Sequence, residues 1–278
     1  MSAYSQLVLR NAGYIDAGTQ ARISEKRLLI AGCGIGSGLA ICATRLGFER
    51  FLLVDGDTVD THNLNRQFYD AADVGRPKVQ ALRDHILRIN PEADVEVIQA
   101  NLDDTNTEAA VSRADIVFDT VDFLDLAAIL KLHDSARRLG KPVFTALSVG
   151  FGALVWYFPA HGPVGLADLL APDLGTVAGE VAAGTTYAGV FASFVQRIAP
   201  VLDEDVIEQI GRVLSLLAEG KPCPAPQVAV GSFAVAAMAT AMIHDMLAGR
   251  AVPAAPSFVV HSFRRHLSQV VDVSQVEG

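Results

Sequence analysis

An arginine and a lysine follow a short apolar run at positions that suit the binding of a polyphosphate. The run 51–54 ends at Asp55, and Arg66 and Lys78 follow it in a chain whose charge balance is otherwise acidic. A planar guanidinium binds phosphate oxygens bidentately, and a lysine adds a compact positive charge. Hydride transfer needs neither cation here, whereas a triphosphate needs both. The pair therefore favours a nucleoside triphosphate as the ligand, and exposed salt bridges are the alternative interpretation.

A glycine-rich turn precedes these cations in the sequence. Gly32, Gly34 and Gly36 follow the apolar run 27–30. Glycines let the backbone approach an anionic ligand, and the start of the next helix offers free N–H groups. The spacing is one residue tighter than G-x-G-x-x-G, so a plain tight turn is the alternative. Asp55 lies where dinucleotide-binding proteins place a carboxylate on the ribose hydroxyls.

Short apolar runs alternate with helical patterns across the part of the chain that holds these residues. We expect strands at 27–30, 51–54, 95–98, 116–118, 142–147 and 154–158, with helices at 38–46, 78–89 and 124–139. This alternation predicts a Rossmann-like α/β fold with a mostly parallel sheet and helices on both faces. We expect antiparallel strands near the C-terminus to complete the sheet. Ligands in such sheets bind beyond the carboxyl ends of the strands, where the glycine-rich turn and Asp55 lie.

The polar residues form a longer pattern than these pairs. The sequence from Asp55 to Gln67 follows D-x-D-x-V-x-x-x-N-L-x-R-Q, G-x-x-K ends at Lys78, and D-x-x-D spans Asp119 to Asp122. The set resembles the nucleotide site of the ubiquitin-activating-enzyme-like family that includes ThiF, MoeB and HesA. The resemblance covers roughly residues 9–158 and returns near 225–249. It implies an ATP-dependent adenylyltransferase that activates a carboxylate as its acyl-adenylate and releases pyrophosphate.

The resemblance also implies roles for the matching residues. Asp55 would hold the ribose, Lys78 would bridge phosphate and developing negative charge, and Asp122 would ligate Mg²⁺. The other residues implied to bind the nucleotide are Gly32, Gly34, Gly36, Asp57, Asn63, Arg66, Gln67 and Val121. Asp57 is expected to orient its loop. Magnesium is typically held by one or two carboxylates plus substrate phosphates, which suits Asp122, and a helix N-cap is the alternative for this residue.

The N-terminal segment 9–15 resembles the part of the family from which an arginine reaches into the partner subunit's nucleotide site. Arg10 would then complete the catalytic set of Arg66, Lys78 and Asp122, and the enzyme would be a homodimer. Such an arginine stabilises charge in the transition state when the partner docks. An exposed helix arginine is the alternative.

The three cysteines depart from the pattern of many relatives. Cys33, Cys42 and Cys223 show no paired C-x-x-C spacing, so we expect no zinc site. Cys223 is either a nucleophile that takes over the acyl group or incidental, because only Lys221 is an evident activating neighbour. Cys33 and Cys42 are expected to be structural. Of two further polar or aromatic residues, His62 is interpreted as a loop residue and Trp156 as core.

The composition of the chain bears on whether it binds nucleic acid or membranes. A net charge of −9 disfavours nucleic acid and anionic membranes. The apolar stretch 228–243 is shorter than the roughly 20 residues that span a bilayer, so we expect a buried or subunit-interface helix. The cysteine count and the lack of an evident signal peptide predict a cytoplasmic protein.

We expect one domain with four parts. These are an N-terminal helical arm at 1–26, a nucleotide-binding α/β core at 27–158, a helical and irregular crossover insertion at 159–226, and a late apolar helix with C-terminal strands at 227–278. Three classes of function stay open: the adenylyltransferase, a catalytically silent nucleotide-binding or scaffolding relative, and an NAD-dependent oxidoreductase. For the first, the carboxylate would belong to a small sulfur-carrier protein, a ribosomal peptide or a small acid.

Overall fold

One mixed sheet runs through the molecule. The structure is a computed structural model that describes residues 2–122, 125–170, 187–219, 221 and 225–275. The strand order is β3-β2-β1-β4-β5-β6-β7-β8, with the first five strands parallel and the last three antiparallel. The strands are β1 (Arg27–Ala31), β2 (Arg50–Val54), β3 (Asp94–Ile98), β4 (Ile116–Asp119), β5 (Val143–Ser148), β6 (Gly152–Phe158), β7 (Ser257–Ser262) and β8 (Leu267–Asp272). The predicted fold class is confirmed.

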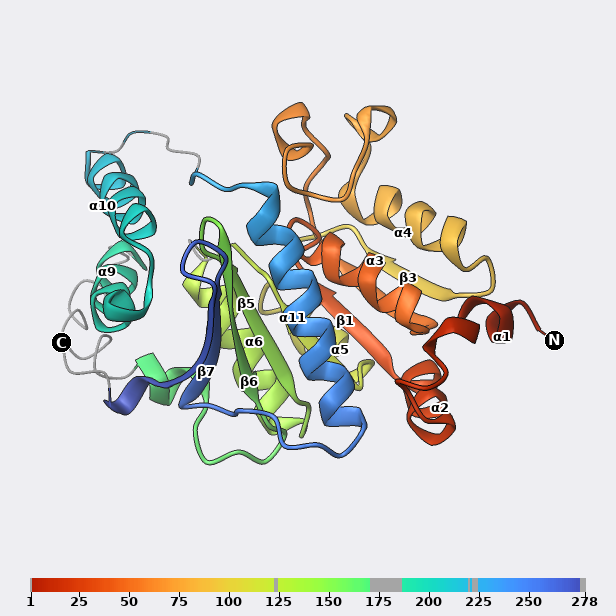
Figure 1. Cartoon of the computed structure of the whole chain (residues 1–278). Coiled ribbons are helices and arrows are strands. Elements are labelled where there is room, and N and C mark those ends of the chain that lie inside the picture. The colour runs from red at the N-terminus through yellow and green to blue at the C-terminus, as the bar shows by residue number, and fades with distance from the viewer. Residues whose placement is uncertain (1, 123–124, 171–186, 220, 222–224, 276–278) are drawn as a thin grey trace.

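Helices cover both faces of the sheet (Figure 1). Those of the described residues are α1 (Ala3–Leu7), α2 (Ala17–Glu25), α3 (Gly36–Leu46), α4 (Lys78–Ile89), α5 (Thr107–Ser112), α6 (Leu126–Arg138), α9 (Tyr187–Ile198), α10 (Glu204–Ala218) and α11 (Ala229–Leu247). Helices α3, α4 and α11 share one apolar core with the sheet, and α5, α6 and α9 share the other. Side chains alternate between the two faces along β1, so this strand contributes to both cores. Leu28 and Ile30 pack in the core with α3, α4 and α11, and Leu29 packs in the core with α5, α6 and α9.

Helix α11 lies across the sheet and packs on α3, β5 and β6. By length and composition alone it could cross a membrane, but half of its apolar window is buried inside the molecule. Small residues make this close packing possible, because a Cβ on Gly231 would lie 2.2 Å from Oγ of Ser148 and a Cβ on Gly38 of α3 would lie 3.3 Å from Cβ of Ala236. The helix therefore belongs to the core, and its outer side leaves Phe233 58% exposed.

Three local predictions need correction. Helix α3 begins at Gly36 rather than at residue 38, so the glycine-rich turn runs directly into its first turn. Helix α5 was not predicted, because its six residues are too few to show a helical period. Helix α6 begins at Leu126, and Asp125 is its N-cap, with its carboxylate accepting from the Ala128 N–H at 3.1 Å. The N-cap alternative for Asp122 is therefore wrong.

Candidate active site

The candidate site lies where the order of the strands reverses. From β1 the chain moves outward to β2 and β3, and it then returns to place β4 on the other side of β1. At such a switch point the connections leave in opposite directions, and a crevice opens beyond the carboxyl ends of the two strands. The glycine-rich turn follows β1, and the residues from Thr120 to Asp122 follow β4. The predicted motifs thus meet at this crevice.

Glycine is required at two positions of the turn. Gly32 has a φ of +89°, and a Cβ there would lie 2.3 Å from the carbonyl oxygen of Thr120. A Cβ on Gly36 would lie 2.7 Å from Oγ1 of Thr120. The same hydroxyl donates to the Gly32 carbonyl at 2.8 Å. The turn is therefore fitted against the end of β4, and the start of α3 points into the crevice.

Asp55 connects the turn to the loop that follows β2. One carboxylate oxygen accepts from the Cys33 N–H at 2.7 Å, and the other accepts from the Asp57 N–H at 2.8 Å. A carboxylate has about four lone-pair sites, so two sites stay open for further donors. Its partly exposed position at the strand end suits a pair of ribose hydroxyls.

Lys78 is the first residue of α4, and its side chain is buried although it carries a charge. The residue is 6% exposed, and its Nζ lies 2.7 Å from the carboxylate of Asp57. The Asp57 side chain is 64% exposed, so water screens much of this ion pair. A buried ammonium with one solvated partner still has donors for an anion. The role of Asp57 is thus to hold Lys78 as well as its loop.

Arg66 makes hydrogen bonds to neutral groups. Its Nε donates to Oε1 of Gln227 at 2.6 Å, and an Nη donates to the His62 carbonyl and to Oδ1 of Asn65, both at 2.9 Å. Within the part of the chain that the structure describes, no carboxylate forms a salt bridge with this guanidinium. Burial lowers the pKa of Arg66, which reflects the cost of keeping the charge there. The arrangement leaves a fixed positive charge for an anionic ligand.

Asn63 and Gln67 differ in how much of their amide is already used. Asn63 is 4% exposed, and its Oδ1 accepts from the Asp60 N–H at 2.9 Å in a capping box of the short helix η2 (Thr61–Asn63). The Oε1 of Gln67 is buried without a hydrogen-bond partner among the described residues. Its amide faces Gly34, where a Cβ would lie 3.2 Å from Nε2. Gln67 is therefore positioned beside the glycine-rich turn. The side-chain carbonyl of Asn63 instead stabilises the loop that follows β2.

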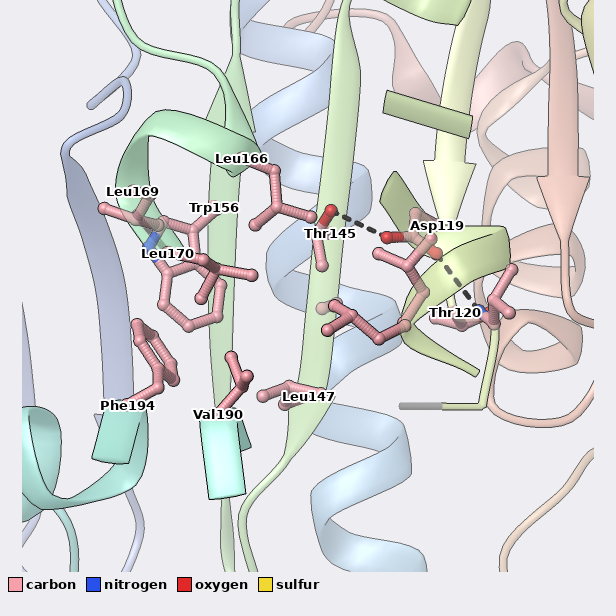
Figure 2. A pocket seen from close by; sticks show the side chains of 14 residues that line it. Asp119, Thr120, Thr145, Leu147, Trp156, Leu166, Leu169, Leu170, Val190 and Phe194 are labelled. Carbon is pink, nitrogen blue, oxygen red and sulfur yellow. Dashed lines mark hydrogen bonds between the residues drawn. The ribbon is translucent and has the colours of Figure 1, made fainter. Parts of the chain in front are cut away.

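A buried polar cluster that the sequence did not reveal anchors the end of β4. Asp119 is 1% exposed, and its Oδ2 accepts from Oγ1 of Thr145 at 3.0 Å and lies 3.1 Å from Nε2 of His133. Its Oδ1 accepts from the Val121 N–H at 3.1 Å (Figure 2). These bonds fix the start of the loop that carries the exposed Asp122. The available sequence signal was weak, because His133 lies in the middle of an amphipathic helix far from any motif.

Other predicted residues lie away from the crevice or outside the described residues. Arg10 is exposed on the N-terminal arm, and the neighbouring Asn11 donates to the Leu46 carbonyl at the far end of α3. Helix α3 has 11 residues, so Arg10 and the glycine-rich turn are separated by about 16 Å of helix. Cys33 is buried, and burial raises the pKa of its thiol, which makes it inert. Cys223 lies outside the described residues.

One group of possible metal ligands lies elsewhere in the described part of the chain. Oxygen and nitrogen atoms of Asp70, Asp73 and His85 come within 4.8 Å of one another. The carboxylate of Asp73 is already used, since it accepts from the Asp70 N–H and pairs with His85 and Arg76. The group stabilises the loop before α4.

The site and the fold together define a class of protein. An open, mostly parallel sheet with a glycine-rich turn, a carboxylate at a strand end and two cations near its switch point is typical of a nucleotide-binding α/β protein. The model of the ThiF family matches residues 6–274, and the chain belongs to this family. The predicted family is therefore confirmed.

Two named adenylyltransferases are similar to this chain in sequence. The sulfur carrier protein ThiS adenylyltransferase of Escherichia coli is 29% identical over 172 residues, which are 61% of this chain and 67% of that protein. The molybdopterin-synthase adenylyltransferase of the same organism is 35% identical over 119 residues, 42% of this chain. The matched segment covers 47% of the length of this second relative, so the chain spans about half of it.

Solved structures show the same fold over nearly the whole chain. A crystal structure of PaaA superposes with a TM-score of 0.69 at 20% identity, covering 98% of this chain and 84% of that one. A crystal structure of E. coli MccB with ATP gives a TM-score of 0.68 at 17% identity, covering 97% and 71%. At this identity the likeness concerns the fold.

Proposed function

We propose that this protein is an ATP-dependent adenylyltransferase that converts a carboxylate into its acyl-adenylate. Its family, and relatives that are themselves named adenylyltransferases, support this activity. The observation that carries the proposal is the guanidinium of Arg66, which is partly buried beside the crevice with neutral partners. A polyphosphate is the ligand that such a charge suits.

The reaction needs positioning and charge rather than covalent help from the protein. An oxygen of the substrate carboxylate attacks the α-phosphorus of ATP, and the bond from that phosphorus to the bridging oxygen breaks. The bonding electrons leave with pyrophosphate, and no proton has to move. Lys78 and Arg66 are fixed cations that offset the charge on the phosphates as the bond breaks. Asp55 orients the ribose, and the glycine-rich turn lets the nucleotide approach the backbone.

The donor set suits Mg²⁺ at Asp122. This carboxylate is exposed, directly follows the stretch that contacts the glycine-rich turn, and lies on a loop that Asp119 fixes. Hard divalent cations prefer oxygen ligands, and magnesium is often held by one or two carboxylates and the substrate phosphates. When bound, Mg²⁺ would neutralise phosphate charge.

The partners are part of the proposal. The exposed Arg10 lies far from the crevice of its own subunit, which agrees with a homodimer in which it reaches the partner's site. The relatives named for ThiS and molybdopterin synthase point to a small carrier protein as substrate, and structures of MccB with MccA point to a peptide. All of these substrates would present a carboxylate.

The test is exchange of labelled pyrophosphate into ATP, measured with a panel of carboxylate peptides and carrier proteins. We expect exchange with one class of substrate, and a loss of about 100- to 1,000-fold in Asp122→Asn, which removes the charge and keeps the shape. Glu108→Gln, a similar change on α5, is the control and should keep full exchange. ATP binding without exchange for any carboxylate would instead favour the silent relative.

A further inference from the structure

A small apolar cavity lies on the other side of the β4 end from the glycine-rich turn. Its volume is about 70 Å³. One wall is the stretch from Asp119 to Val121, and this stretch also touches the turn, because Thr120 donates to the Gly32 carbonyl at 2.8 Å. One residue therefore separates the cavity from the nucleotide crevice.

The other walls come from elements far apart in the sequence (Figure 2). Apart from Thr145 of β5, they are apolar side chains of α6, β5, β6, the helical segment 166–170 and α9, among them Leu126, Leu147, Trp156, Leu169, Val190 and Phe194. Figure 2 shows Trp156, Val190 and Phe194 on one side of the pocket and Asp119 and Thr120 on the other. A group that enters the cavity thus exchanges water for aliphatic and aromatic surface.

The polar atoms in the wall leave no site for a charged occupant. The carboxylate of Asp119 is already bonded to Thr145, His133 and the Val121 N–H. The indole N–H of Trp156, a residue that is 3% exposed, has no hydrogen-bond partner among the described residues. The rest of the wall is apolar, so an uncharged, apolar occupant suits it.

The size of the cavity limits the occupant. A single water needs about 10–15 Å³ measured in this way, so 70 Å³ holds about five such groups. A branched aliphatic or thioether side chain has three or four heavy atoms. Glycine would leave the space unfilled, and an indole would not fit.

We propose that this cavity receives the apolar side chain next to the reactive carboxylate of the substrate. The substrate class is then a peptide, or a small acid, whose terminal unit is aliphatic, such as leucine, isoleucine, valine or methionine. This inference rests on the proposed adenylation and narrows its substrate. Specificity follows because each methylene that enters an apolar pocket is worth about tenfold or more in kcat/KM.

The experiment uses the full chain and five peptides that differ only in their last residue: glycine, alanine, valine, leucine or tryptophan. Pyrophosphate exchange gives kcat/KM for each, and calorimetry gives the affinity for ATP. We expect the leucine peptide to exceed the glycine peptide by about 100-fold or more. Exchange that is strongest with the glycine peptide would overturn the inference and leave adenylation standing. If none of the five peptides, carrier proteins or small acids supports exchange, both the proposed adenylation and this inference are wrong.

Two variants separate a specificity pocket from a merely structural cavity. Val190→Phe fills the space, so the leucine peptide should lose its advantage over the alanine peptide while the affinity for ATP persists. Phe194→Leu enlarges the space, so activity with the tryptophan peptide should rise. The two shifts run in opposite directions, which general destabilisation cannot produce. If Val190→Phe fails to fold, Phe194→Leu decides, and an unchanged order of peptides there contradicts the inference.

Discussion

The two sides of the β4 end differ in chemistry and in origin. The crevice on one side has fixed charges, from Arg66, Lys78 and Asp55, and all three lie within one continuous part of the sequence. The cavity on the other side is apolar, and its walls come from the end of β4 and five further elements. The difference indicates a division of tasks. In our proposal, the nucleotide side supplies the charges for adenylation, and the cavity side selects the substrate.

Removing the charge of Lys78 should have the largest effect and should be confined to the crevice side. Lys78→Met keeps the buried aliphatic stem and removes the ammonium, so we expect exchange to fall by about 1,000-fold. The order of preference among peptides in the residual activity should not change. Lys131→Met, at an exposed ion pair with Asp104, is the matched control. Substantial residual exchange in Lys78→Met would remove this residue from the catalytic set.

The Asp119 cluster connects the two sides, so its loss should affect both. Asp119→Ala leaves the Val121 N–H without its acceptor and leaves His133 and Thr145 only their mutual hydrogen bond at 2.9 Å. Each buried group without a partner costs about 1–3 kcal/mol, so we expect a loss of about 3 kcal/mol in the free energy of unfolding. Denaturant unfolding gives this value. Asp119→Asn, which keeps one of the two acceptor oxygens, should lose less, and equal losses in the two variants would contradict the hydrogen-bond explanation.

Gln227 offers a finer change on the crevice side. Its carbonyl Oε1 accepts from Arg66 at 2.6 Å across 161 positions of sequence, and the Gln227 backbone carbonyl accepts from Asn65 at 3.0 Å. Gln227→Glu would place a carboxylate on the guanidinium and make it compete with the phosphates. We expect the KM for ATP to rise about tenfold, which corresponds to the loss of one charge-assisted contact.

Gln227→Met separates the effect of an added negative charge from the effect of losing the acceptor that positions Arg66. It removes the acceptor without adding a charge, so its KM should change less than that of Gln227→Glu. The same KM in both variants would show that competition for Arg66 is not the cause.

The smallest effect concerns the loop before α4 and depends on pH. Burial raises the pKa of Asp73, but hydrogen bonds from the Asp70 N–H and His85, with Arg76 nearby, more than offset this, so the pKa lies below its usual value. A carboxyl group whose pKa is lower in the folded protein than in the unfolded chain stabilises the fold. This stabilisation is fully present above the unfolded pKa of about 3.9, and it is lost as the pH falls through the pKa of the folded protein.

Asp73→Asn should therefore lower the free energy of unfolding by about 1 kcal/mol at pH 7, and this difference should shrink as the pH falls below about 3.9. Thermal melts from pH 7 down to pH 3 follow the difference. A constant difference between the two proteins over this range would exclude Asp73 as the titrating group.

Most of the parallel core could be predicted because its signals are local. The runs 28–30 and 51–54 are buried on both faces, so they are apolar throughout, and the structure gives the strands as Arg27–Ala31 and Arg50–Val54. Helix α5 and the start of α6 could not be predicted in the same way. A six-residue helix shows no period, and the choice between Asp122 and Asp125 as the N-cap depends on where the loop leaves β4.

The sequence by itself determined the order of the crevice residues, because a glycine-rich turn and a strand-ending carboxylate follow from backbone geometry and local pattern. Only the tertiary structure decided that Asp57 holds Lys78, that Gln227 holds Arg66, and that Asp119 meets His133 and Thr145. The cavity likewise exists only in the folded chain. Local pattern specifies how a segment folds, whereas contacts between distant segments depend on how the helices and the sheet pack, and no short spacing records them.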